Sequence, residues 1–156
     1  MMKALIIVGA GEFGHVVKEL AESLGYDKIG FLDDNSPEAI GKVADFETFV
    51  GEYEEFVVSI GNPAVRERLY VELSGAFAAA TLVSPRAYVS PSAVLGSGCI
   101  VEPMAVVNTG ATVGVACIIN AGAVVNHNAV VEDFCQVDCG AVVGARECVK
   151  KGTKVR

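Results

Sequence analysis

The sequence predicts an α/β Rossmann-like domain followed by a parallel β-helix built from hexapeptides. In the C-terminal half of the chain, an aliphatic residue occurs at every sixth position. A small residue, usually Ala or Cys, stands two places before nearly all of them. The N-terminal part instead reads as strand, glycine-rich turn, helix and strand. We therefore expect two domains, residues 1–81 and residues 82–156, and about four coils in the second.

The six-residue period fits neither an amphipathic helix nor a simple two-sided strand. It matches short strands that turn corners around a narrow core, which branched side chains fill. The place after each aliphatic residue is commonly Gly, Asn or Asp, which tolerate the positive φ that we expect at the corners. The aliphatic positions are Val83, Val89, Leu95, Val101, Val107, Val113, Ile119, Val125, Val131, Val137, Val143, Val149 and Val155.

A cysteine ladder follows from the same repeat. If three hexapeptides make one coil, residues eighteen apart stack, so Cys99, Cys117 and Cys135 form a column inside the core. Thiols also bind metals, but Cys is a good small core residue, and we expect no metal here. The five cysteines of the chain are an odd number without a secretory signal, which indicates reduced thiols and a cytoplasmic protein.

The charge and hydropathy patterns exclude several classes of partner. A net charge of −7 without a basic stripe argues against nucleic acid and anionic membranes. The apolar run over residues 4–8 breaks at Gly9, so it predicts a buried strand rather than a signal peptide. No stretch approaches the length of a transmembrane span. A short solenoid leaves a long face uncovered, and self-association would cover it.

The N-terminal domain opens with a strand at residues 4–8 and the glycine motif GAGEFG at residues 9–14. A helix follows, with an apolar side made by Val16, Val17, Leu20 and Leu24, and Gly25 ends it. A second strand at residues 28–32 leads into Asp33 and Asp34. In this context Gly9, Gly11 and Gly14 would let the backbone approach a phosphate, and the two aspartates would accept hydrogen bonds from ribose hydroxyls. Alternatively, the glycines only tighten the turn.

The rest of this domain predicts a second, partial βα unit. A loop with a short helix after Asp45 precedes a third strand at residues 55–60. Asn62 is a good N-cap and Pro63 a good first residue for a helix, whose apolar face is Val65, Leu69 and Leu73. Gly61 and Asn62 follow the strand, at the edge where open α/β sheets bind ligands. Residues 78–83 form the last strand. The domain suits a mononucleotide portion, so hydride transfer is not expected.

Two histidines are candidates for chemistry. His15 follows Gly14 and would be solvated or at the edge of a ligand. His127 stands between Asn126 and Asn128, two places after an inward valine. This is a corner position, so the imidazole would point outward and could act as a general base near neutral pH. The alternative is a surface histidine without a function.

Four segments resemble one family, the bacterial sugar O- and N-acyltransferases. This family includes the sialic acid O-acetyltransferases and the UDP-4-amino-sugar acetyltransferases. The N-terminal segment resembles the opening strand and glycine loop of the family, and the last resembles the stretch around its catalytic histidine. The segments are IIVGAGEFGHVV at 6–17, FLDD at 31–34, IGNP at 60–63 and IINAGAVVNHN at 118–128.

The resemblance implies a homotrimer of left-handed β-helices with acetyl-CoA between neighbours. A nucleotide-activated sugar would bind its nucleotide on the α/β domain, and His127 would take a proton from its amine or hydroxyl as that group attacks the thioester. Asn120 and Asn128 would be the other catalytic residues, and Asp133 lies nearby. Acetyl-CoA would contact Gln136, Gly144 and Ala145. The implied nucleotide-sugar residues are Gly9, Gly11, Phe13, Gly14, Asp33, Asp34, Gly61 and Asn62.

Three departures from the family keep an alternative open. The family has an acid where this chain has Asn128, a second histidine where it has Gln136, and further coils beyond the position of Arg156. The alternative is a non-catalytic trimeric protein that binds nucleotide sugar or acts as a scaffold. Zinc carbonic anhydrases on the same solenoid need several histidines, and His127 is alone. Serine and maltose acetyltransferases lack the glycine-loop domain and fit less well.

Overall fold

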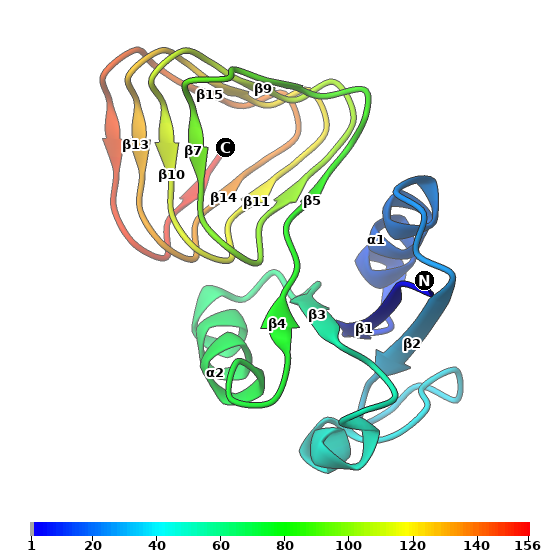
Figure 1. The fold of residues 1–156 in the computed structure, drawn as a ribbon. Coiled ribbons are helices and arrows are strands. Elements are labelled where there is room, and N and C mark those ends of the chain that lie inside the picture. Colours follow the sequence, from blue (N-terminus) through cyan, green and yellow to red (C-terminus); the bar gives the residue numbers. More distant parts are fainter. Residues whose placement is uncertain (1) are drawn as a thin grey trace. The chain divides into compact units, whose positions relative to one another are not determined.

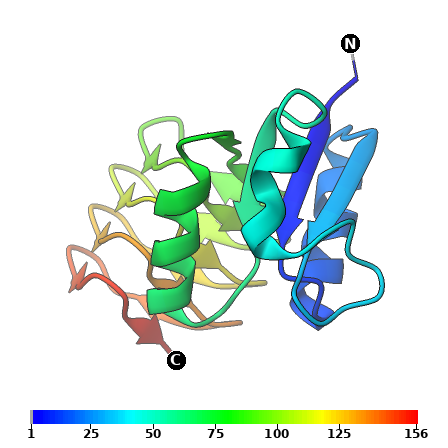
Figure 2. The ribbon, with the colours of Figure 1, turned by 90° about the horizontal axis from the view of Figure 1, so that it is seen from below.

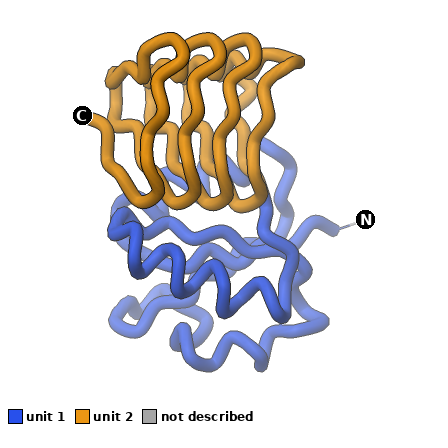
Figure 3. Tube along the Cα trace, turned by 90° about the vertical axis from the view of Figure 1, so that its left-hand side faces the viewer, with its two compact units in different colours: residues 1–80 blue, residues 81–156 orange. Residues whose placement is uncertain are grey.

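The computed structural model describes residues 2–156, which form two compact units with separate hydrophobic cores (Figure 3). Unit 1 ends at Ala80, and unit 2 spans Thr81–Arg156. The first is an α/β fold with a parallel sheet, and the second is a parallel β-helix. The fold class expected from the sequence is therefore confirmed.

Unit 1 contains a parallel sheet with the strand order β2-β1-β3-β4 (Figure 1). The strands are β1 (Ala4–Val8), β2 (Lys28–Leu32), β3 (Glu55–Val58) and β4 (Ala78–Ala79). The connections from β1 to β2 and from β3 to β4 run in opposite directions along the sheet, so right-handed crossovers place their helices on opposite faces. The strand order therefore reverses between β1 and β3, where open α/β sheets bind ligands.

The first helix, α1 (Glu12–Ser23), begins inside the glycine motif. Val17 and Leu20 are buried, as predicted, and Gly25 has a φ of +86° just after the end of the helix. The expectation for Val16 was wrong, because its side chain is 43% exposed and faces away from the core. Adjacent residues such as Val16 and Val17 point in different directions around a helix, so both cannot lie on its buried face.

The second helix, α2 (Pro63–Leu73), has the predicted start. Pro63 is its first residue, and the Asn62 side chain accepts a hydrogen bond from the Val65 N–H at 3.1 Å. This contact satisfies one of the N–H groups that a helix start leaves without a partner. Leu69 and Leu73 enter the same hydrophobic core as alternate residues of β1.

Two expectations about local structure need correction. The short helix is a 3₁₀ helix, η1 (Val43–Phe49), which begins before Asp45 because the Asp34 carboxylate accepts from the Val43 N–H at 3.0 Å. The strand predicted over residues 78–83 is two strands. Ala80 still donates to Phe56 of unit 1, whereas the Leu82 N–H donates to a β-helix carbonyl, so the chain changes sheets between them.

Unit 2 consists of thirteen two-residue strands that stack in three parallel sheets, and Figure 2 shows the coils following one another in chain order. The partner of each strand lies eighteen residues away, as in the pairing of Ile118 with Ile100. The second residue of each strand belongs to or packs against the core. The strands are β5 (Leu82–Val83), β6 (Tyr88–Val89), β7 (Val94–Leu95), β8 (Ile100–Val101), β9 (Val106–Val107), β10 (Thr112–Val113), β11 (Ile118–Ile119), β12 (Val124–Val125), β13 (Val130–Val131), β14 (Gln136–Val137), β15 (Val142–Val143), β16 (Cys148–Val149) and β17 (Lys154–Val155).

The positive φ angles do not lie where the sequence analysis expected them. They occur three places after the inward aliphatic residue. Where the residue directly after it is Asn or Asp, its side chain can accept a backbone hydrogen bond instead. Asn126 and Asp138, for example, each accept a hydrogen bond from the next backbone N–H. The left-handed positions are Gly98, Met104, Gly110, Ala116, Gly122, Asn128, Phe134, Gly140, Arg146 and Gly152.

The cysteine ladder is confirmed. Cys99, Cys117 and Cys135 are fully buried in the β-helix core. Each thiol donates to a backbone carbonyl fifteen residues later in the chain, at 3.0–3.1 Å. The three cysteines therefore act as small core residues whose only polar group is satisfied.

Candidate functional site

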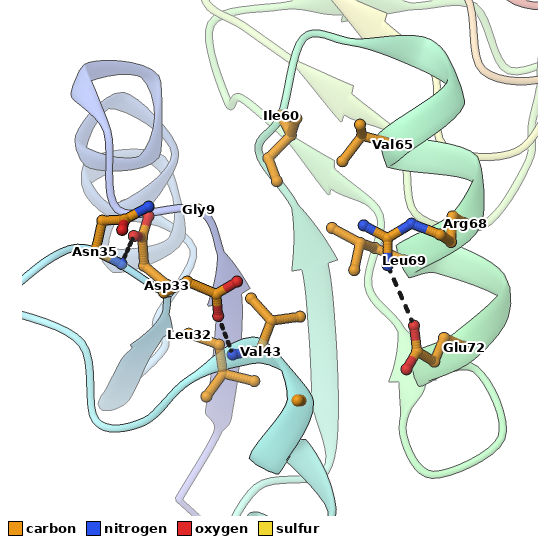
Figure 4. Close-up of a pocket in the computed structure, with 12 residues that line it drawn as sticks. Gly9, Leu32, Asp33, Asn35, Val43, Ile60, Val65, Arg68, Leu69 and Glu72 are labelled. Atoms are coloured by element: carbon orange, nitrogen blue, oxygen red, sulfur yellow. Dashed lines mark hydrogen bonds and ion pairs between the residues drawn. The ribbon is translucent and has the colours of Figure 1, made fainter.

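A pocket of about 310 Å³ opens in unit 1 beyond the carboxyl ends of β1, β2 and β3 (Figure 4). This is the edge at which the strand order reverses. One part of its wall is apolar, and the rest carries carboxylates, an amide and a guanidinium. The lining residues are Gly9, Leu32, Asp33, Asp34, Asn35, Val43, Ala44, Ile60, Val65, Arg68, Leu69 and Glu72. Of the residues predicted to bind nucleotide sugar, Gly9, Asp33 and Asp34 line it, and Gly11, Phe13, Gly14, Gly61 and Asn62 do not.

The three glycines of the motif have different roles. Gly9 has a φ of +106°, and a side chain on Gly14 would meet the Gly9 carbonyl oxygen at 2.1 Å. Both glycines are therefore required by the turn itself. Gly11 has a φ of −75° and nothing within 4 Å of an added Cβ. Neither the backbone conformation nor packing therefore requires glycine at position 11. The space beside Gly11 is open, and a ligand could approach the backbone there.

The two aspartates after β2 hold loops. Asp33 accepts from the Ala10 N–H at 2.8 Å, and also from the N–H groups of Asn35 and Ser36. The Ala10 N–H, followed by that of Asn35, holds the pKa of Asp33 below its ordinary value. Asp34 accepts one backbone N–H through Oδ1. Because Asp33 is largely used by the backbone, Asp34 has more capacity to accept from a ligand.

Helix α2 contributes charged side chains that the sequence analysis missed. Arg68 and Glu72 line the pocket, and Nη1 of Arg68 lies 3.7 Å from Oε2 of Glu72. Arg68 supplies the guanidinium of the pocket wall, and its side chain is 66% exposed, so a ligand could reach it. The signal was present in the sequence, since Val65, Arg68, Leu69 and Glu72 have the spacing of a single helix face.

His15 links the glycine loop to the loop after β2. Its Nε2 lies 2.8 Å from the Glu38 carboxylate, and its Nδ1 lies 2.9 Å from the Gly11 carbonyl. Both partners only accept hydrogen bonds, so both ring nitrogens donate in this geometry. The hydrogen bond to Glu38, followed by that to Gly11, raises the pKa of His15. The ring also packs against Phe31, with 5.2 Å between ring centroids.

His127 lies at a corner of the β-helix and is exposed, as predicted. Its backbone N–H donates to Oδ1 of Asn126 at 2.7 Å. Its Nδ1 lies 3.3 Å from Oδ1 of Asn128, which only accepts, so a hydrogen bond between them requires the proton on Nδ1. In that neutral tautomer Nε2 keeps its lone pair, and the residue is exposed. The Asn128 amide can thus orient the imidazole.

A second polar group lies at the preceding corner. Asn120 and Glu102 are both buried, and Nδ2 of Asn120 donates to Oε2 of Glu102. Nε2 of Gln136 donates to Oδ1 of Asn120 at 2.8 Å. Asn120 and Gln136 were predicted from the sequence, whereas Glu102 was not. Glu102 stands eighteen residues before Asn120 and therefore one coil earlier. Within residues 2–156, no hydrogen bond joins His127 to Asn120 or Gln136.

The other residues named from the sequence have local roles. The Gly144 N–H donates to Oε2 of Glu147 at 2.8 Å, and Ala145 is exposed. Asp133 accepts from the Val115 N–H at 2.9 Å, which links neighbouring coils. In the part of the chain that the structure describes, no group of three or more His, Cys, Asp or Glu side chains could hold a metal ion. None of the helices in that part is both long and apolar enough for a bilayer span.

Comparisons with known proteins place these features in a family. Residues 4–73 match the PglD N-terminal domain. The acetyltransferase domain of PglB from Neisseria gonorrhoeae is 31% identical, with a TM-score of 0.85, and the match covers 97% of this chain and 84% of that one. The chain belongs to the hexapeptide-repeat sugar acyltransferase family. The β-helix of this family member is the left-handed form that the resemblance implied.

More distant structures share the fold of this acyltransferase. A perosamine N-acetyltransferase variant from Caulobacter crescentus, solved with CoA and GDP-perosamine, is 22% identical with a TM-score of 0.92. That match covers 99% of this chain and 77% of the other. WeeI from Acinetobacter baumannii is 17% identical with a TM-score of 0.73, over 98% of this chain and 94% of that one. No curated protein matches the chain significantly.

Proposed function

We propose that this acyltransferase moves an acetyl group from acetyl-CoA to an amino group of a nucleotide-activated sugar. The observation that carries the proposal is the outward-facing His127 with its Nδ1 held by Asn128. The comparisons support the substrate classes. The PglB domain was also solved with acetyl coenzyme A, and the Caulobacter enzyme is a perosamine N-acetyltransferase solved with GDP-perosamine.

The nucleotide would bind in the pocket of unit 1. Its apolar wall suits the face of a base, and Asp34 and Glu72 provide acceptors for N–H and O–H groups of a nucleoside. Phosphates would lie outside the acidic wall, near the open space at Gly11 and the start of α1. Phe13 lies in the first turn of α1, and Gly61 and Asn62 directly follow Ile60 of the pocket wall, so all three remain candidates for substrate contacts.

The chemistry would need one base. Nε2 of His127 takes a proton from the amine as its nitrogen attacks the thioester carbon. The new C–N bond forms, the C–S bond breaks, and the thiolate of coenzyme A leaves with the proton that His127 had taken. Asn128 would fix the tautomer of His127 without adding charge. The amide can therefore orient the imidazole as a carboxylate would, but it cannot supply the negative charge of a carboxylate.

Acetyl-CoA would contact Asn120, Gln136, Gly144 and Ala145, and a neighbouring subunit would complete the site. Asn120 and His127 lie at different corners of one chain, which is consistent with a site shared between subunits. Two sheets of the β-helix also expose aliphatic side chains, including Val94 and Val142, each more than half exposed. Exposed apolar rows favour association, and we propose the homotrimer implied by the resemblance. Free thiols favour a reducing, cytoplasmic location.

The test is acetyl transfer monitored by mass spectrometry. Purified protein is mixed with acetyl-CoA and a panel of UDP-linked 4-amino sugars, GDP-perosamine and CMP-sialic acid. We expect one sugar to gain the mass of one acetyl group, and the His127→Ala variant to lose this activity by at least about a hundredfold. Gain on CMP-sialic acid alone would instead show hydroxyl acylation.

The competing function is a non-catalytic binding protein. The departures at Asn128 and Gln136 are the observations in its favour. It predicts that a nucleotide sugar binds in calorimetry while no sugar of the panel is acetylated. Activity that persists in His127→Ala would also contradict the proposed role of the histidine.

A further inference from the structure

A buried carboxylate ends a row of amide side chains in unit 2. Glu102 and Asn120 are only 8% and 6% exposed, and they follow β8 and β11, which are neighbouring strands of one sheet. Asn120 donates to Glu102 through Nδ2, and Gln136 donates to Asn120 through Nε2 at 2.8 Å. Glu102 has no role in the proposed chemistry, and a buried carboxylate is costly unless it is hydrogen-bonded.

The carboxylate determines which way both amides point. An ionised carboxylate only accepts hydrogen bonds, so the Asn120 atom that faces it must be the donor, Nδ2. The Asn120 Oδ1 then faces Gln136, which must present its own donor, Nε2. Reversing either amide would set acceptor against acceptor or donor against donor. Without Glu102, either orientation of Asn120 would be available.

We propose that Glu102 is a positioning residue that fixes the Asn120 and Gln136 amides for acetyl-CoA. This inference rests on the proposed function, in which Asn120 and Gln136 contact acetyl-CoA. In the fixed orientation, Gln136 keeps its Oε1 and one N–H for a ligand. A donor and an acceptor side by side complement a secondary amide, a group that the pantetheine arm of coenzyme A contains. A reversed Gln136 would exchange the positions of the donor and the acceptor.

The experiment compares Glu102→Ala and Glu102→Gln with a matched control, Ser84→Ala. Ser84 is the residue one coil before Glu102 in the same column, and it is also buried, but its hydroxyl only accepts from the Arg86 N–H. Three quantities are measured: the side-chain amide NMR signals of Asn120 and Gln136, the Kd for acetyl-CoA, and kcat with the accepted sugar. Asn120→Ala and the double variant Glu102→Ala/Asn120→Ala complete a cycle.

In Glu102→Ala we expect both amide signals to shift. The Kd for acetyl-CoA should rise about tenfold, and kcat should fall about tenfold. Glu102→Gln keeps an acceptor and should stay within about threefold of the wild type. Because Glu102 acts through Asn120, the double variant should be no slower than Asn120→Ala. Ser84→Ala should leave all three quantities unchanged.

Unchanged amide signals in Glu102→Ala, or losses that multiply in the double variant, would overturn the proposal. If Glu102→Ala does not fold, the amide signals of Glu102→Gln test the proposal. This variant is expected to keep the contact to Asn120, so a loss of that contact would contradict the proposal. Failure of the proposed function looks different. In that case the wild type acetylates no sugar, while the amide signals and the acetyl-CoA titration still report on Glu102.

Discussion

At the scale of single residues, the orientation of His127 depends on one neighbour in an uncommon backbone conformation. Asn128 has a φ of 58°, which Asn tolerates better than most residues, and this conformation brings its Oδ1 to 3.3 Å from Nδ1 of the imidazole. The same residue therefore closes a corner of the β-helix and selects a tautomer. Substitutions at Asn128 can separate the two roles.

Replacing Asn128 by Gly and by Ala gives the first prediction. Both variants lose the amide that holds Nδ1, so we expect kcat to fall about tenfold in each. Only Ala is strained at this φ, so Asn128→Ala should also lower the free energy of unfolding by about 1–2 kcal/mol relative to Asn128→Gly. Steady-state kinetics and chemical unfolding measure the two effects. Equal stability of the two variants would contradict the assigned strain.

The five thiols should divide into two groups. Cys139 and Cys148 are exposed, whereas Cys99, Cys117 and Cys135 are buried. The Cys117 thiol, together with burial, raises the pKa of Cys135 far above its usual range, so little thiolate forms. We expect an alkylating reagent to modify only the two exposed thiols in the folded protein and all five after unfolding, as counted by mass spectrometry. Rapid modification of the ladder would show that the core opens.

At the scale of elements, the turn between β1 and α1 combines a packing requirement with an open approach. Gly14→Ala would place a methyl group against the Gly9 carbonyl, and we expect it to destabilise unit 1 by about 3 kcal/mol. Gly11→Ala meets no atom and should change stability by less than about 1 kcal/mol. If a phosphate approaches Gly11, Gly11→Ala should nevertheless weaken the binding of nucleotide sugar at least about tenfold, as measured by calorimetry. Unchanged affinity would mean that the glycines only shape the turn.

The ion pair between His15 and Glu38 joins α1 to the loop after β2 and should respond to pH. The folded-state pKa of His15 is raised, so its contribution is complete below the unfolded-state pKa and disappears as the pH rises through the folded value. We expect the imidazole NMR signal of His15 to titrate above the ordinary pKa of 6.5. In Glu38→Gln the midpoint should fall, because the largest cause of the shift is removed.

The His127→Ala variant assigns the remaining histidine signal to His15. An identical midpoint in Glu38→Gln and the wild type would show that the ion pair does not form in solution. Both side chains of the pair are about half exposed. We therefore expect the ion pair to add little to thermal stability and to act mainly by holding the loop after β2 against α1.

At the scale of the whole molecule, the β-helix surface predicts association. The outward residues of the sheet β15-β12-β9-β6 are Tyr88, Val106, Val124 and Val142, an apolar row. We expect light scattering to give three times the mass of one chain, and Val142→Asp to reduce it. Val71→Asp is the control, because Val71 is 65% exposed on α2. A monomeric wild type that acetylates a sugar would contradict the shared site.

Repetition decided how much of the fold could be predicted. The six-residue aliphatic period predicts the coils, because every strand needs an inward aliphatic side chain at one position in six. Residues 78–83 were misjudged because an apolar run predicts a strand without naming its partner. The left-handed corner positions were misplaced for a related reason. Met104, Phe134 and Arg146 adopt positive φ that their side chains do not favour, so only the stacked coils impose it.

The candidate site divides in the same way. His127, Asn120 and the glycine motif have recognisable neighbours in sequence, so they could be named from it. Glu102 could not, because its importance comes from an amide one coil later. Arg68 and Glu72 share a helix face that the sequence spacing indicates, but only the structure places that face at a pocket at the end of a sheet. Contacts across coils and across the sheet join residues that no local pattern connects.

The sequence by itself determined the two-part architecture, the period of the coils and the outward position of His127, because these follow from local patterns of side-chain size and polarity. Only the tertiary structure decided which groups are free to act. It showed Asp33 committed to backbone N–H groups, Nδ1 of His127 held by Asn128, and the Asn120 amide oriented by a buried carboxylate. The physical reason is that hydrogen-bond capacity is limited, and which partners use it depends on distance in space.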